Sequence, residues 1–124
     1  MANIEYKIKL SEVDILDITI SRNEVGEVTK FVVNYRAQFK ETGERWYEIY
    51  RIDTCHEYLH EQKFWRGPEP IRIEGKERTL EQVFDNAIDT LSSEYWKFKH
   101  LFRILKLGEI LESWKKEGQR KKGR

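Results

Sequence analysis

Apolar and polar residues alternate with a period of two through most of the first half of the chain. The alternation runs through residues 4–10, 16–20 and 31–39, and residues 45–53, which are dense in aromatic side chains, indicate a fourth strand. A period of two is typical of strands with one buried face. Turn-forming residues lie between the runs, at 23–26 and 41–44. The pattern therefore predicts successive antiparallel strands joined by short connections.

The spacing of apolar residues changes to three and four after residue 79. Thr79 and Gln82 stand at the two ends of a capping box, the sequence signature of a helix start. Apolar residues at helical spacing then run from Leu80 to Tyr95 and again from Phe98 to Trp114, and Gly108 indicates a kink or break. This predicts one bent helix or two helices, with an apolar stripe that covers one face of the sheet.

Between these two regions the sequence predicts a hairpin. Residues 53–57 form its turn, and residues 58–65 form a fifth strand that returns beside the fourth. Pro68 and Pro70 follow, and Ile71 and Ile73 indicate a short edge strand, where proline is tolerated. Strands first and helices last predict an α+β domain. We expect an antiparallel meander of about five strands, followed by one or two C-terminal helices packed on one face.

Length and composition limit the class of protein. A chain of 124 residues with 39% hydrophobic residues makes one globular domain, which we assign to residues 1–117. It contains no apolar run of the ~20 residues that span a membrane, and its start does not resemble a signal peptide, so we expect a cytoplasmic protein. The single cysteine, Cys55, allows no intrachain disulfide. The high content of charged residues, 36%, is typical of thermophilic proteins.

Basic residues gather at the C-terminus. Lys115, Lys116, Arg120, Lys121 and Lys122 lie in this stretch. Clustered positive charge is a candidate contact for nucleic acid. A solubilising terminus explains the same residues, and the sequence favours a disordered tail over residues 118–124.

His56-Glu57-Tyr58-Leu59-His60 matches the zinc motif H-E-x-x-H. The motif needs a helix, which places the two imidazoles on one face. The neighbouring strand and Pro68 favour a hairpin instead, and no third ligand is recognisable. No cofactor is therefore favoured, and His56 and His60 are the ligands if zinc or another divalent metal binds.

Arg51, Asp53, His56 and His60 form the pattern R-x-D-x-x-H-x-x-x-H at the end of a predicted strand. This stretch resembles the R-x-D-N-A-x-H segment of the TumE-type toxin proteins and related small archaeal and bacterial proteins. Those chains also have a run of strands, an Asp/His turn and a C-terminal helix. Thr54 and Cys55 replace the usual Asn and Ala. The resemblance implies the toxin of a toxin–antitoxin pair, with a cognate antitoxin as partner and RNA as a candidate target.

The same four residues are candidate catalytic residues on chemical grounds. An imidazole transfers protons at neutral pH, a carboxylate orients it, and a guanidinium holds a phosphate. This set suits metal-free RNA cleavage. A purely structural role explains it as well, because Asp at a strand end accepts turn N–H bonds and Arg51 pairs across strands. Whether the protein is an enzyme stays open at this point.

Two other functions remain as alternatives. A protein-binding or self-associating module would carry an exposed apolar patch, expected at Ile110 and Trp114, and would form a homo-oligomer. A metal-dependent hydrolase would use His56 and His60. Aromatic residues beside basic ones also stack nucleic-acid bases. We expect most of the aromatic residues around the fourth and fifth strands to lie in the core: Trp46, Tyr47, Tyr50, Phe64 and Trp65.

Overall fold

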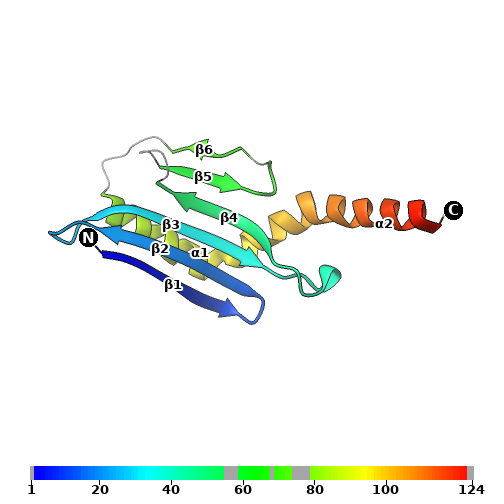
Figure 1. Cartoon of the computed structure of the whole chain (residues 1–124), viewed down its shortest axis with the longest axis horizontal. Helices are drawn as coiled ribbons and strands as arrows, with labels where there is room; N and C mark the ends of the chain where they lie inside the picture. Colours follow the sequence, from blue (N-terminus) through cyan, green and yellow to red (C-terminus); the bar gives the residue numbers. More distant parts are fainter. Residues whose placement is uncertain (1, 55–58, 68, 74–78, 123–124) are drawn as a thin grey trace.

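The computed structural model describes residues 2–54, 59–67, 69–73 and 79–122. Six antiparallel strands form one sheet, and each strand pairs with its neighbour in sequence (Figure 1). They are β1 (Ala2–Ser11), β2 (Asp14–Arg22), β3 (Val28–Ala37), β4 (Tyr47–Asp53), β5 (His60–Lys63) and β6 (Ile71–Arg72). The α+β class and the antiparallel meander are confirmed, with the short edge strand as the sixth.

The C-terminal helices form one continuous run with a change of pitch. Helix α1 (Leu80–Phe102) leads into a π-helical turn, η3 (Arg103–Leu107), and then into α2 (Gly108–Lys122). The π turn therefore lies immediately before Gly108, and α1 itself has a kink at Glu94, whose backbone angles are not helical (φ −125°, ψ 15°). Helix α2 runs to Lys122, so the backbone of residues 118–122 is helical. Gln, Lys and Arg are good helix formers, and adding residues to an existing helix avoids the cost of nucleation.

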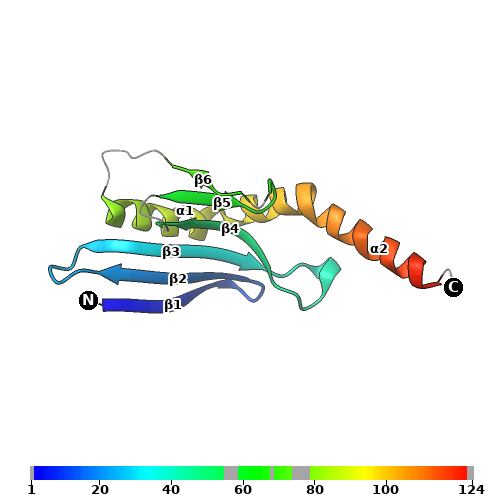
Figure 2. The ribbon, with the colours of Figure 1, turned by 45° about the horizontal axis from the view of Figure 1, so that its top comes forward.

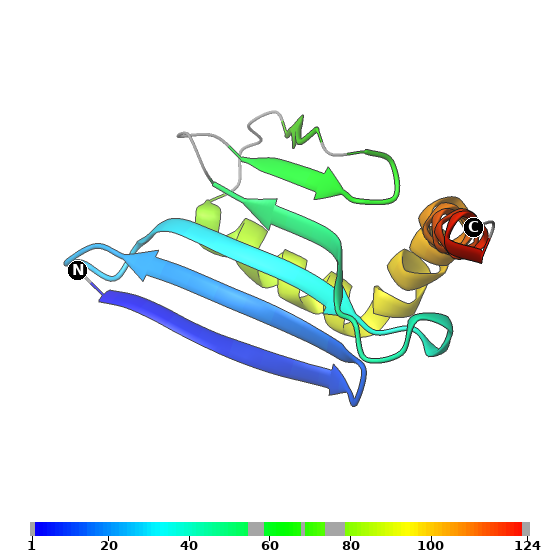
Figure 3. The ribbon, with the colours of Figure 1, turned by 45° about the vertical axis from the view of Figure 1, so that its right-hand side comes forward.

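Helix α1 lies across one face of the sheet, and none of the described helices covers the opposite face (Figures 2 and 3). Helix α2 continues beyond the end of the sheet. The short 3-10 helix η1 (Lys40–Thr42) lies in the connection between β3 and β4. The sheet thus has a helix face and an open face.

The alternation along β2 and β3 produces the helix face. Leu16 and Ile18 on β2 are buried opposite Tyr35 and Val33 on β3. Aromatic contacts join this face to α1: the ring centroids of Phe31 and Phe84 are 5.4 Å apart, and those of Tyr50 and Phe98 are 5.0 Å apart. Aromatic pairs stabilise by about 0.5–1.5 kcal/mol beyond the area they bury. α1 is therefore held by packing along its length.

The start of α1 follows the sequence prediction. The Thr79 hydroxyl accepts a hydrogen bond from the backbone N–H of Gln82 at 3.1 Å, and the Gln82 side chain accepts one from the N–H of Thr79 at 3.0 Å. The capping box is therefore confirmed. Arg22 at the end of β2 pairs with Glu81 at 3.0 Å and adds a contact between the sheet and this end of the helix.

Two strand boundaries differ from those predicted. β4 begins at Tyr47 instead of residue 45, and β5 covers only His60–Lys63. Tyr50 and Trp65 are buried, and Tyr47 and Phe64 pack against the core, so the core assignment of most aromatic residues is confirmed. Trp46 is the exception, because it lies partly exposed beside Arg36.

Candidate functional site

Asp53 joins two other predicted site residues at the end of β4. Its Oδ1 lies 2.9 Å from Nδ1 of His60, and its Oδ2 accepts a hydrogen bond from Nε of Arg51 at 2.6 Å. Asp53 is 6% exposed and His60 8% exposed, whereas about a third of the Arg51 side chain is exposed. A buried carboxylate is therefore held between an imidazole and a guanidinium.

The strand register explains why these residues meet. Asp53 and His60 are directly paired across β4 and β5, so their side chains leave the same face of the sheet. Arg51 is two residues before Asp53 and shares that face. Ile52 lies between them and belongs to the core. Arg51, Asp53 and His60 consequently lie on the open face, opposite α1.

The backbone after Asp53 is fixed to β3. The N–H of Thr54 donates to the carbonyl oxygen of Phe31 at 3.1 Å, and the Thr54 hydroxyl accepts a hydrogen bond from the N–H of Phe31 at 3.0 Å. Two bonds to one residue of the neighbouring strand restrict the end of β4. The Asp53 carboxylate is thus positioned before any ligand arrives, which is what a catalytic or binding group requires.

The arrangement combines proton transfer with anion binding. When Nδ1 of His60 donates to Asp53, the basic lone pair of the neutral imidazole lies on Nε2. The Nε–H of Arg51 donates to Asp53, and a guanidinium has further N–H groups that match the oxygens of a phosphate. Arg51, Asp53 and His60 therefore form an acid–base group beside an anion-binding group.

The one histidine of the H-E-x-x-H motif that the structure describes, His60, is not in a helix. His60 lies in strand β5, and its Nδ1 faces Asp53, as the hairpin interpretation expects. His56 lies outside the described residues, as do residues 55, 57 and 58. Within the described part of the chain, no three His, Cys, Asp or Glu side chains are grouped so that they could hold a metal ion. His100 is exposed on α1.

A second charged group on the open face was not anticipated from the sequence. Asp17 on β2 accepts hydrogen bonds from Nε of Arg36 and Nζ of Lys7, both at 2.5 Å. The Arg36 guanidinium lies 4.7 Å from the centre of the Trp46 ring. Burial acts to raise the pKa of Asp17, but the hydrogen bonds from Arg36 and Lys7 outweigh it and lower the pKa. The polar positions alternating along β2 and β3 are the signal that points to this face.

Two hollows lie along the open side of the sheet. The larger is lined by Glu5, Tyr6, Lys7, Asp17, Ile18, Thr19 and Arg36. The smaller, of about 100 Å³, is lined by Thr19, Ser21, Lys30, Phe31, Val32 and Thr54. The smaller hollow borders the site, because Val32 is paired with Asp53 and Thr54 follows it.

The basic residues of the C-terminus lie apart from this site. Lys115 and Lys116 are exposed on α2, and Arg120, Lys121 and Lys122 belong to the same helix. In Figure 1, α2 extends past the end of the sheet opposite to the one where β4 ends at Asp53. The structure therefore does not bring the basic cluster and the Asp53 group together.

No curated protein and no solved structure matches this chain. None of the helices in the described residues is both long and apolar enough to cross a membrane. A family model described as a domain of unknown function matches residues 1–104, which span the sheet, the Asp53 group and α1. Since this match covers most of the chain, the protein belongs to the DUF7718 family.

Proposed function

We propose that this protein binds RNA on the open face of its sheet and cleaves it with His60 as the proton acceptor, acting in the cytoplasm as the toxin of a toxin–antitoxin pair. The observation that carries the proposal is the buried Asp53 carboxylate, which lies 2.9 Å from His60 Nδ1 and 2.6 Å from Arg51 Nε. The resemblance of Arg51 to His60 to the TumE-type segment supports the toxin assignment.

The proposed reaction is an internal transfer within the RNA. Nε2 of His60 accepts the proton of a 2′-hydroxyl, and the 2′-oxygen attacks the adjacent phosphorus. The bond from phosphorus to the 5′-oxygen breaks, that oxygen takes a proton from water, and the hydroxide that remains takes back the proton held by His60. The products are a 2′,3′-cyclic phosphate and a 5′-hydroxyl. Asp53 stabilises the imidazolium that forms, and Arg51 binds the phosphate oxygens.

Groups next to Asp53 offer further contacts to RNA. Lys30 and Thr54 line the small hollow beside it, where a sugar or phosphate group would bind. Arg36 lies on the same face, two residues along β3 from Asn34, which is paired with Arg51. Trp46 stacks on Arg36 and is partly exposed, so it offers an aromatic surface to an unpaired base. Single-stranded RNA is therefore the substrate class that fits best.

Cleavage of a labelled single-stranded RNA by the purified protein in EDTA tests the proposal. We expect cyclic-phosphate products, and a His60→Gln variant should lose at least about 100-fold in rate, because general-base catalysis contributes about that much. His100→Gln is the matched control, since His100 is exposed on α1, on the other side of the sheet. Its rate should stay unchanged. RNA with 2′-deoxyribose at the cleaved position should resist cleavage.

Three outcomes would contradict the proposal. Absence of cleavage across a random RNA pool would remove the enzymatic function, and equal rates for His60→Gln and the wild type would remove His60 from it. Activity lost in EDTA and restored by zinc would favour the metal-dependent alternative. Circular dichroism of each variant shows whether it is folded, and Arg51→Gln gives a second test if His60→Gln does not fold.

The toxin assignment has its own test. Induced expression of the chain should arrest growth of the host cells, and the His60→Gln variant should not. Co-expression of the neighbouring gene should restore growth if it encodes the cognate antitoxin. Growth that is unaffected by the wild-type chain at confirmed expression would contradict the toxin assignment while leaving RNA cleavage to be decided in vitro.

A further inference from the structure

The outer side of the helical run carries large exposed apolar side chains. Trp96 and Ile104 are each 59% exposed, and Leu101 and Leu105 are also exposed. Of the two residues expected to form an apolar patch, Trp114 is 36% exposed and its ring lies 4.9 Å from the Arg45 guanidinium, whereas Ile110 packs against the core. We call the set of Trp96, Leu101, Ile104 and Leu105 the outer face.

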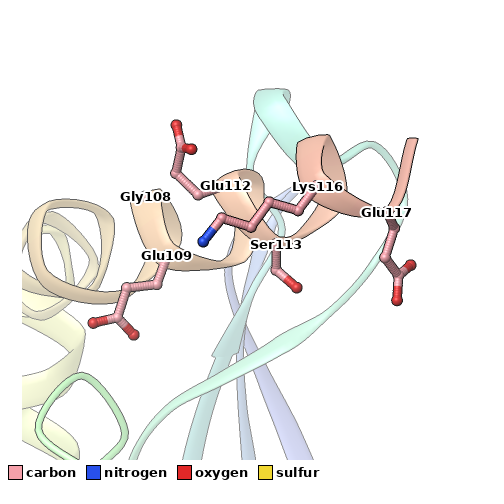
Figure 4. Close-up of a pocket in the computed structure, with 6 residues that line it drawn as sticks. All are labelled: Gly108, Glu109, Glu112, Ser113, Lys116 and Glu117. Carbon is pink, nitrogen blue, oxygen red and sulfur yellow. The ribbon is translucent and has the colours of Figure 1, made fainter. Parts of the chain in front are cut away.

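The π-helical turn aligns the outer face with α2. A π turn has about one residue more than an α turn, so Leu101, Leu105 and Glu109 follow one another along one line of the helix. Phe102 and Leu107 point the other way, into the core. The outer face thus continues into a surface hollow on α2, which is lined by Gly108, Glu109, Glu112, Ser113, Lys116 and Glu117 (Figure 4).

Gly108 lies in the middle of this surface, and no neighbouring atom of the described chain requires a glycine there. A Cβ atom built at Gly108 has no neighbour within 4 Å, and the residue has ordinary helical angles. Glycine weakens a helix interior relative to alanine. Small residues in a helix allow a second helix to approach closely, so Gly108 favours a partner at this position.

The charged residues before Leu101 and those after Leu105 form a self-complementary pattern. Lys97 lies one turn before Leu101, and Glu112 and Lys116 follow Leu105 along the same side of the helix. Glu94 lies at the kink of α1, one turn before Lys97. A second copy running in the opposite direction would place its Glu112 beside Lys97 and its Lys116 beside Glu94. A self-complementary pattern of this kind is what a twofold-symmetric contact requires.

We propose that two copies of this chain associate in antiparallel fashion through the outer face. Ile104 and Leu105 of each copy lie at the twofold axis, Leu101 packs over Gly108 of the second copy, and Trp96 enters the hollow beside Ser113 of the second copy. Burial of the four exposed apolar side chains drives association, and the charged pairs set its direction.

Pairs within the chain reduce repulsion in this contact. Arg103 pairs with Glu41, and Lys106 pairs with Glu109 at 3.5 Å, so these two basic residues near the axis are already neutralised. Lys97 lies 2.9 Å from Glu94 in the same chain and would share its charge with Glu112 of the second copy. Because a two-helix contact buries less than about 1,200 Å², we expect a Kd on the order of 10 µM.

Sedimentation equilibrium of the full chain at about 1–100 µM tests the proposal, because this range brackets the expected Kd. The wild type should pass from monomer to dimer, and Leu105→Glu should weaken the dimer at least ~100-fold, since each substitution acts twice in a symmetric contact. Val25→Glu is the control: Val25 is 78% exposed in the loop between β2 and β3, and its variant should dimerise like the wild type.

Charge exchange tests the antiparallel register itself. Glu112→Lys should weaken the dimer about tenfold, because it creates two like-charge contacts with Lys97. Adding Lys97→Glu should restore most of the affinity. A wild-type chain that stays monomeric at about 100 µM would overturn the proposal. A dimer that Leu105→Glu leaves intact would place the contact elsewhere, and a double variant no tighter than Glu112→Lys would overturn the register.

Discussion

The hydroxyl of Tyr35 donates a hydrogen bond to Oδ1 of Asp14 at 2.5 Å, and both residues are buried. The same oxygen lies 3.2 Å from Nζ of Lys99, and Oδ2 accepts a hydrogen bond from the Ser11 hydroxyl at 2.5 Å. One carboxylate therefore connects the turn between β1 and β2 with β3 and α1. Burial and the bond to Asp14 raise the pKa of Tyr35, which keeps its hydroxyl protonated as the donor.

Tyr35→Phe should destabilise the fold without changing its shape. The substitution removes one donor from a buried carboxylate, which costs about 1–3 kcal/mol. Lys99 and Ser11 keep Asp14 partnered, so the variant should still fold. Urea unfolding at neutral pH measures the loss. Tyr6→Phe is the control, because Tyr6 is exposed on β1 and its variant should stay within about 0.5 kcal/mol of the wild type. Equal stability of both variants would show that the Asp14 group contributes nothing.

Asp17 should make the free energy of unfolding depend on pH in the acidic range. Its pKa is lowered in the folded state, so its contribution is complete above its unfolded pKa of about 3.9 and is lost as pH falls through the folded pKa. The Asp17 side chain is partly exposed and its partner Lys7 is exposed, so screening limits the effect to about 0.5–1 kcal/mol. Asp17→Asn should therefore be less stable than the wild type at pH 7. Between pH 5 and pH 2, its free energy of unfolding should fall less than that of the wild type.

Salt separates this effect from a general loss of packing. The difference between Asp17→Asn and the wild type at pH 7 should shrink in about 1 M NaCl, because the pairs with Arg36 and Lys7 are partly exposed and are screened. Unfolding in urea at three pH values and two salt concentrations gives the required set. A difference that salt and pH leave unchanged would contradict an electrostatic origin.

Thr79→Ala should weaken the start of α1. It removes the hydroxyl that accepts from the Gln82 N–H, whereas the backbone N–H at position 79 can still donate to the Gln82 side chain, so one of the two bonds of the capping box is lost. Loss of such a cap costs about 1 kcal/mol. Thermal unfolding followed by circular dichroism detects the change. Ser92→Ala, at an exposed position inside α1, is the matched control and should be neutral or slightly stabilising. A Thr79→Ala variant as stable as this control would show that α1 is held by packing alone.

Local patterns in the sequence predicted the elements with most success. Alternation places Leu16, Ile18 and Ile20 on one face of β2, and Thr79 with Gln82 marks the start of α1, since both signals depend only on neighbouring residues. Asp53 and His60 could be grouped for a similar reason: a short hairpin brings the end of one strand to the beginning of the next.

Contacts between residues distant in sequence could not be predicted in this way. Lys99 meets Asp14 only because α1 crosses the sheet at that point, and no motif links the two positions. The Arg36–Trp46 contact depends on an irregular register between β3 and β4, where the pairing shifts after Tyr35. The π turn before Gly108 adds about one residue to the helical period, which helical spacing alone did not predict, so the exposed Leu101, Ile104 and Leu105 were missed and Ile110 was wrongly expected to be exposed.

Asp53→Asn should separate proton transfer from RNA binding. The amide keeps the size of the side chain but removes the charge that stabilises the His60 imidazolium, and an amide N–H donor in place of Oδ1 would favour the other tautomer of His60. We expect the cleavage rate to fall at least about 100-fold. The Kd for RNA should change by less than about threefold, since Arg51 and Lys30 bind the phosphates by charge.

Arg51→Gln should show the reverse: a weaker Kd, most clearly at low salt, and a smaller effect on the rate at saturation. Fluorescence anisotropy and single-turnover cleavage measure the two quantities on the same labelled RNA. If Asp53→Asn weakened binding as much as cleavage while remaining folded, the carboxylate would be a structural support of the open face, and His60 would lose its assignment as the proton acceptor.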